Sequence, residues 1–161
     1  MSSNVLVTGA AGFIGGSVVA ALLSGNAHFP AKNLFAAARG EEQVQSIQSL
    51  GIKALQLNLQ DEQSVTEAVL QNEIDIVIHT ASSIDTRLAI HLIKALGERR
   101  KATGKDTYHI HSSVTTGYSK EGGWPYGEVK DGDSVYKLEK ELVNGRDYLK
   151  TSPLPSKPAS P

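Results

Sequence analysis

Short apolar runs alternate along this chain with segments in which apolar residues recur at helical spacing. The runs predict strands over Val5–Thr8, Asn33–Ala38, Lys53–Leu57, Asp75–His79 and Tyr108–His111. The segments between and after them predict helices over Phe13–Ser24, Glu41–Leu50, Glu62–Leu70, Ile84–Lys101 and Ser134–Val143. Strands that alternate with helices are joined by right-handed crossovers. The pattern therefore predicts an α/β fold built on a parallel, doubly wound sheet.

We expect the strand order 3-2-1-4-5, with strands numbered along the chain. In such a sheet a ligand binds beyond the carboxyl ends of the strands, where the order reverses between the first and fourth strands. Residues 1–150 are expected to form this domain. The Ser- and Pro-rich segment 151–161 is expected to be a disordered tail.

The turn after the first strand has the sequence Thr8-Gly9-Ala10-Ala11-Gly12-Phe13-Ile14-Gly15. Gly9 permits a tight turn, Gly12 lets backbone amides approach a phosphate, and Gly15 lets the following helix pack closely on the strand. The helix N-terminus offers free N–H groups and a favourable dipole to an anion. The motif predicts a dinucleotide site that includes Gly9, Ala11, Gly12, Phe13, Ile14 and Gly15. The alternative is a glycine-rich turn that binds nothing.

Arg39 at the end of the second strand indicates which dinucleotide binds. A carboxylate at this position would bind both ribose hydroxyls of NAD, whereas an arginine can hold the 2′-phosphate of NADP. No acidic residue occurs between Leu34 and Gly40. The sequence therefore favours NADP over NAD. The alternative is that Arg39 binds no cofactor and is a solvated residue at the start of a helix.

Two further strand ends complete the predicted cofactor site. Asn58 and Leu59 follow the third strand, where the Asn58 amide could bond the adenine edge or cap a turn. Thr80 and Ala81 follow the fourth strand, where small residues would let the backbone lie close to the cofactor. An ordinary strand-to-loop turn is the alternative there.

Three segments together resemble the short-chain dehydrogenase/reductase superfamily. They are TGAAGFIG, the segment IDIVIHTAS at the end of the fourth strand, and the pair Ser112-Ser113 after the fifth. The glycine spacing is similar to that of the extended and atypical branches, the NAD(P)-dependent epimerase/dehydratase-like proteins, over about Asn4 to Lys150. The resemblance implies hydride transfer to or from a carbonyl or alcohol. It also implies a serine that orients the substrate oxygen, a tyrosine that acts as general acid/base, and a lysine that lowers the tyrosine pKa.

Two Tyr-x-x-x-Lys pairs match the family pattern, Tyr126–Lys130 and Tyr136–Lys140. Spacing of i, i+4 places both side chains on one helical face. Tyr126 lies in a Gly- and Pro-rich segment that reads as a loop, so Tyr136 and Lys140 are the preferred catalytic candidates. Ser113 aligns best with the family serine, and Ser112 and Thr115 are alternatives. The alternative to a catalytic role is that the hydroxyls of this Ser- and Thr-rich segment cap backbone groups in a turn.

Composition narrows the classes of partner. The net charge of −1 argues against nucleic acid or a membrane surface, and the lack of cysteine excludes disulfides and thiolate chemistry. No apolar run approaches the roughly 20 residues of a membrane span, and a core strand begins too early for a signal peptide. We therefore expect a cytoplasmic protein. His109 and His111 have no third ligand at metal-binding spacing, so packing or surface roles are expected.

The chain departs from the resembled family after Lys150, where extended members continue into a sixth strand and a substrate domain. We expect strand five to be an open edge, so that the chain is either truncated or associates with itself. Two functions stay open. One is an NADP-dependent oxidoreductase or epimerase-like enzyme, and the other is a non-catalytic nucleotide-binding module. The sequence does not identify the substrate.

Overall fold

A computed structural model describes residues 3–24, 29–113, 118–120, 124–130, 132–135 and 137–138. The chain divides into two compact units, Met1–Ser112 and Ser113–Pro161. Of the predicted last helix, only residues 134, 135, 137 and 138 are described, and the last three of these are helical. The predicted tail, 151–161, lies outside the described residues.

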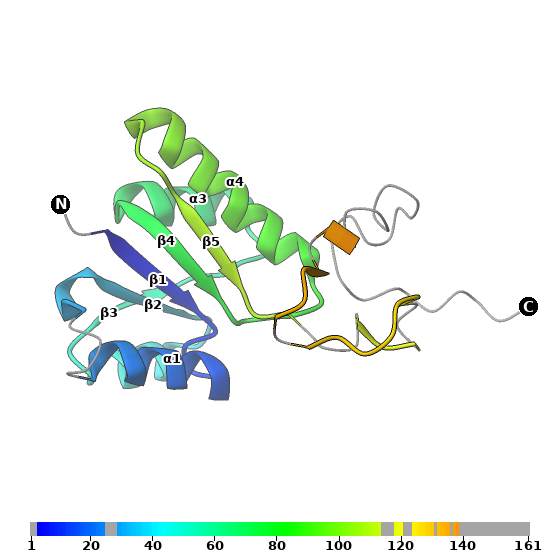
Figure 1. The fold of residues 1–161 in the computed structure, drawn as a ribbon. Helices are drawn as coiled ribbons and strands as arrows, with labels where there is room; N and C mark the ends of the chain where they lie inside the picture. Colours follow the sequence, from blue (N-terminus) through cyan, green and yellow to red (C-terminus); the bar gives the residue numbers. More distant parts are fainter. Residues whose placement is uncertain are drawn as a thin grey trace, which may run out of the picture. The chain divides into compact units, whose positions relative to one another are not determined.

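The first unit contains a five-stranded parallel sheet in the order β3-β2-β1-β4-β5 (Figure 1). The strands are β1 (Asn4–Thr8), β2 (Leu34–Ala38), β3 (Lys53–Gln56), β4 (Ile74–His79) and β5 (Tyr108–His111). In register, Thr8 lies opposite both Ala37 and His79. The predicted strand order and parallel, Rossmann-like topology are confirmed.

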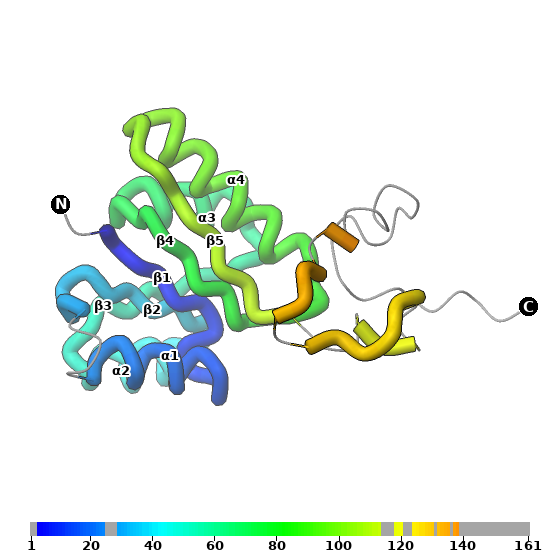
Figure 2. The backbone as a smooth tube through the Cα atoms, in the orientation of Figure 1, coloured from blue at the N-terminus to red at the C-terminus, as the bar shows by residue number. Residues whose placement is uncertain are grey.

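Helices cover both faces of the sheet. They are α1 (Phe13–Leu23), α2 (Glu41–Gln48), α3 (Glu62–Gln71) and α4 (Thr86–Thr103), together with an unpredicted 3-10 turn at Ala31–Asn33. Figure 2 shows α1 and α2 on one side, with α3 and α4 on the other. Alternate strand residues separate into two apolar clusters. Leu6 and Val77 lie in one with Leu92 and Leu96 of α4, and Val5 and Val7 lie in the other with Val19 of α1.

Helix ends follow the capping chemistry of the sequence. Asp61 is the N-cap of α3, because its side chain accepts hydrogen bonds from the backbone N–H groups of Gln63 and Ser64 at 3.1 and 3.2 Å. Helix α4 begins at Thr86, later than the predicted Ile84. The Ser82 hydroxyl accepts from the backbone N–H of Asp85 at 3.0 Å, and Asp85 then caps the helix. These local hydrogen bonds hold residues 82–85 as a turn.

A buried ion pair joins α4 to β4. Arg99 Nε donates to Asp75 Oδ1 at 3.1 Å, and Arg99 Nη2 forms an ion pair with the same oxygen at 3.1 Å. The two side chains are only 7% and 8% exposed. A second carboxylate, that of Glu73, lies 3.8 Å from Arg99 Nη1. The sequence pattern did not reveal this pair. None of the helices described in the structure is long and apolar enough to span a bilayer.

In the second unit, Trp124 is the centre of an aromatic cluster. It is 6% exposed, and its Nε1 donates to the Gly127 carbonyl at 3.2 Å. The rings of Tyr118 and Tyr126 contact it edge-to-face, with centroids 5.2 and 5.1 Å away. Residues 124–130 form no helix or strand, so Tyr126 lies in a loop as predicted.

Candidate functional site

The turn between β1 and α1 packs directly against the end of β4. Gly9 has φ +72°, and a Cβ at this residue would lie 2.7 Å from the backbone N and Cα of Ala81. At Gly15 a Cβ would overlap the Gly9 carbonyl oxygen and lie 2.6 Å from Thr80 Oγ1. Glycine is therefore required at both positions, for the left-handed turn and for the close approach of the two loops.

Thr80 fixes the two strand ends to one another. Its backbone N–H and its hydroxyl both donate to the Thr8 carbonyl, at 3.2 and 2.7 Å. The bonds join β1 to β4 at the point where the strand order reverses. Ligands bind at this point in folds of this type.

A cleft of about 420 Å³ opens along the carboxyl ends of the strands. The predicted site residues Gly9, Ala11, Gly12, Arg39, Asn58, Leu59, Thr80 and Ala81 line this cleft. Phe13, Ile14 and Gly15 do not line it. They form the first turn of α1, where Phe13 is 92% exposed, Ile14 is 52% exposed and Gly15 is buried.

The N-terminus of α1 is arranged to receive an anion. Gly12 is the N-cap, so no side chain caps the first turn, and that turn contains no acidic residue. The first amides of a helix have no partner within the helix. The amides of Phe13, Ile14 and Gly15 can therefore donate to a phosphate supported by the helix dipole.

Arg39 follows β2 and lines the cleft. Its side chain is exposed, and its carbonyl accepts from Gln56 Nε2 at 3.2 Å. No residue in the described part of the chain forms an ion pair or hydrogen bond with the Arg39 guanidinium. A guanidinium with no partner among the described residues can accept an anionic ligand without breaking an ion pair to any of them.

The turn after β3 forms the wall of the cleft. Asn58 Oδ1 accepts from the Gln60 N–H at 3.1 Å, and the Asn58 carbonyl accepts from the Asp61 N–H at 3.1 Å. Asn58 thus caps its own turn while lining the cleft. The Leu59 side chain is 7% exposed and belongs to the apolar cluster beneath α3 and α4.

Several cleft residues were not predicted from the sequence. They are Ala37, Ala38, Gln43, Leu57, Gln60, Ser82, Asp85 and Leu88. Those in β2 and beside Asn58 could have been found from their position at strand ends. Asp85 and Leu88 were missed because the predicted start of α4 placed Asp85 inside the helix, whereas it is the cap at the edge of the cleft.

The predicted catalytic residues are only partly described. Ser113 is exposed and is the first residue of the second unit, whereas Tyr136, Lys140 and Thr115 lie outside the described residues. Ser112 is half-buried, and its N–H donates to the His79 carbonyl at 3.0 Å.

Three histidines form a triangular cluster on the α4 side of the sheet, in which the centroids of His109 and His111 are 6.0 Å apart. The rings of His79 and His111 stack with centroids 5.2 Å apart, and His109 lies 5.9 Å from His79. His79 is fully buried, with Nδ1 2.7 Å from Thr8 Oγ1. Burial, and then the neighbouring His111 and His109, lower the pKa of His79 to about 4. Within the described residues, no group of His, Asp or Glu side chains is arranged to hold a metal ion.

The chain is similar to a curated enzyme over part of its sequence. It is 34% identical over 83 residues to a decarboxylating sterol-4-alpha-carboxylate 3-dehydrogenase from Dictyostelium discoideum, a match that covers 52% of this chain and 23% of that protein. The chain thus aligns with about a quarter of the relative's length.

Solved structures share the fold at lower sequence identity. A short-chain dehydrogenase/reductase family oxidoreductase from Burkholderia thailandensis superposes with a TM-score of 0.58 at 18% identity, covering 74% of this chain and 54% of that one. An NADPH-dependent quinone oxidoreductase from Escherichia coli, in complex with NADPH, superposes with a TM-score of 0.55 at 21% identity, covering 87% and 44%. The family model for the NAD dependent epimerase/dehydratase family matches residues 5–111, most of the chain, and the chain therefore belongs to this family.

Proposed function

We propose that the cleft binds NADP(H), with the pyrophosphate at the N-terminus of α1 and the 2′-phosphate at Arg39. The exposed guanidinium of Arg39, which has no partner among the described residues, is the observation that carries this proposal. A second observation concerns Asp85, the acidic residue of the cleft lining. Its carboxylate is bound by Arg87 Nε and Nη2 at 3.2 and 3.1 Å, which balances its charge.

The cofactor's adenine half would lie between the Asn58–Gln60 turn and residues 82–88, since both segments line the cleft. Bound NADP(H) would supply a hydride acceptor or donor. The small side chains of Ala81 and Ala11 leave backbone groups accessible along the path between the adenine wall and the first turn of α1. The described chemistry of the cleft thus fits a dinucleotide with an additional phosphate.

Replacing Arg39 with alanine is expected to weaken NADPH binding by roughly 10- to 100-fold, because a hydrogen bond to a charged group contributes about 1.5–3 kcal/mol. The affinity for NADH, which lacks the 2′-phosphate, should change by less than about twofold. Fluorescence titration of both nucleotides with both proteins measures this difference. An equal loss for the two nucleotides would contradict a 2′-phosphate role.

For the chemical step we propose that Tyr136 acts as general acid/base, Lys140 supports it, and Ser113 orients the substrate oxygen. The support is membership of the family, the i, i+4 spacing of Tyr136 and Lys140, and the oxidoreductase names of the relatives. The proposed substrate is a carbonyl compound or an alcohol.

Tyr136→Phe provides the test of this step. It should abolish NADPH oxidation across a panel of carbonyl substrates while leaving the Kd for NADPH within about twofold, because the phenylalanine cannot transfer a proton. Tyr126→Phe is the matched control and should be active. Equal turnover by wild type and Tyr136→Phe would contradict the role. Nucleotide binding without turnover by any of the proteins would favour the non-catalytic module.

We also propose that the chain self-associates through the edge of its sheet. Among the described residues β5 pairs with β4 alone, and Tyr108 and Ile110 of β5 are 58% and 54% exposed. An exposed edge strand with apolar side chains favours pairing with another chain. Size-exclusion chromatography with light scattering should show a dimer or larger species. A stable monomer at high protein concentration would contradict the proposal.

A further inference from the structure

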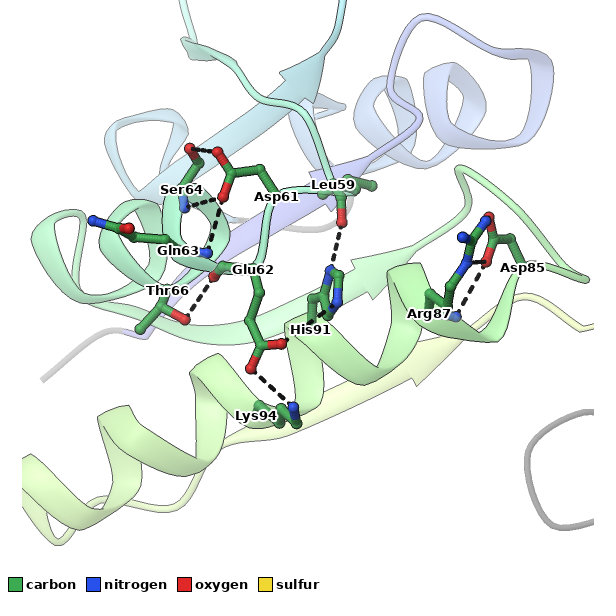
Figure 3. Close-up of polar contacts among 10 residues, drawn as sticks. All are labelled: Leu59, Asp61, Glu62, Gln63, Ser64, Thr66, Asp85, Arg87, His91 and Lys94. Atoms are coloured by element: carbon green, nitrogen blue, oxygen red, sulfur yellow. Dashed lines mark hydrogen bonds and ion pairs between the residues drawn. The ribbon is translucent and has the colours of Figure 1, made fainter.

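His91 of α4 forms a hydrogen bond to the turn that follows β3. Its Nδ1 lies 2.9 Å from the Leu59 carbonyl oxygen, and its Nε2 lies 3.6 Å from Glu62 Oε2 (Figure 3). The His91 side chain is only 17% exposed. The ring is therefore held between α4, the Asn58–Asp61 turn and the first residue of α3.

The Leu59 carbonyl oxygen determines which nitrogen of the His91 ring carries hydrogen. A carbonyl oxygen has no hydrogen to donate, so His91 Nδ1 must carry the N–H. Nε2 then faces the Glu62 carboxylate, either with a bare lone pair or, in the imidazolium form, with a second N–H. The bond to Leu59 persists in both protonation states.

This bond connects the two walls of the cleft. One wall is the Asn58–Gln60 turn. The hydrogen bonds that Asn58 accepts from the backbone N–H groups of Gln60 and Asp61 hold this turn in one conformation. The other wall includes Asp85 and Leu88, at the cap and in the first turn of α4. His91 follows Leu88 by three residues, about 4.5 Å further along the same helix. A displacement of the turn relative to α4 would break the His91–Leu59 bond.

We propose that His91 is a positioning residue that sets the separation of these two walls and thereby the fit of the adenine half of the nucleotide. The inference rests on the proposed function, because it assigns the adenine half to this part of the cleft. His91 does not line the cleft and acts through the Leu59 backbone.

Two substitutions of His91 distinguish the role of Nδ1 from that of Nε2. In His91→Asn the amide nitrogen can occupy the place of Nδ1 and still donate to Leu59, whereas in His91→Gln it reaches the place of Nε2. With 2′,5′-ADP as the probe, we expect the asparagine variant to bind within about twofold of wild type. We expect the glutamine variant to bind about three- to tenfold more weakly, since it leaves the Leu59 carbonyl without its donor.

The exposed ion pair between Lys94 Nζ and Glu62, at 2.9 Å, supplies the matched control on the same helix (Figure 3). Lys94→Gln should leave the 2′,5′-ADP affinity unchanged within about twofold. Equal affinity of the wild type and the glutamine variant, or equal losses in the asparagine and glutamine variants, would overturn the role of Nδ1. Failure of wild type to bind 2′,5′-ADP would instead overturn the proposed function itself.

A measurement on the wild type does not depend on whether the variants fold. The ¹⁵N resonances of the His91 ring report which nitrogen carries hydrogen in the neutral form. Hydrogen on Nδ1 supports the bond to Leu59, and hydrogen on Nε2 alone would overturn it.

Discussion

Replacing Arg99 with methionine is expected to lower the free energy of unfolding by about 3–5 kcal/mol, because it leaves the buried Asp75 carboxylate without its partner. Arg99 donates one hydrogen bond to Asp75 Oδ1 through Nε and forms an ion pair with it through Nη2, both at 3.1 Å, and the two side chains are 7% and 8% exposed. Glu73 is 71% exposed and loses little when Arg99 is removed, since water can solvate it. The effect is therefore expected to come from Asp75.

Urea denaturation of the purified chain measures this effect as a lower midpoint at an unchanged slope. The double variant Asp75→Leu with Arg99→Met is the control, because it removes both charges and fills a similar volume. Its stability should return to near that of wild type or exceed it. If the single and double variants are equally destabilised, lost packing and not the unpaired carboxylate explains the result.

Acidification is expected to destabilise the protein through the cluster of His79, His109 and His111. The pKa of His79 is about 4 in the folded chain and near 6.5 when unfolded, because folding buries the ring beside His111 and His109. The unfolded chain therefore binds more protons, and the stabilisation present above pH 6.5 is lost as the pH falls toward 4. One pKa unit corresponds to about 1.4 kcal/mol, so His79 should account for about 2–3 kcal/mol after allowance for solvent screening.

His109 and His111 also lower the stability of the folded chain as the pH falls. Burial, and for His109 also the nearby His111, lowers their pKa values below the ordinary histidine range. His79→Gln removes the fully buried titrating group and keeps a polar side chain near Thr8. The difference between the wild-type and variant unfolding free energies should vary from pH 7 to pH 4, with the wild type losing more. Parallel pH profiles would contradict the assignment.

Most of the fold could be predicted from the sequence because the strands and helices have distinct apolar periods. Ile76-Val77-Ile78 is continuously apolar and lies in the central part of the sheet between β1 and β5, as a buried parallel strand requires. The start of α4 was placed too early because residues 82–85 are governed by hydrogen bonds to the Ser82 hydroxyl, which carry no periodic signal.

The cofactor side of the site was predictable where it depends on strand ends and glycine. Gly9 and Gly15 are needed for backbone approach, and their spacing is visible in the sequence. His91 was not singled out, because its role depends on a carbonyl 32 residues away in the chain. The Arg99–Asp75 pair was missed for the same reason, since its partners lie on different elements.

Titration of the purified chain with NADPH and NADH tests the central claim most directly, by nicotinamide fluorescence together with thermal unfolding. A ligand that binds only the folded state at 100 times its Kd stabilises it by about 2.7 kcal/mol. The proposed site predicts saturable NADPH binding with a raised Tm and weaker binding of NADH. A folded chain that binds neither nucleotide would contradict the proposed function.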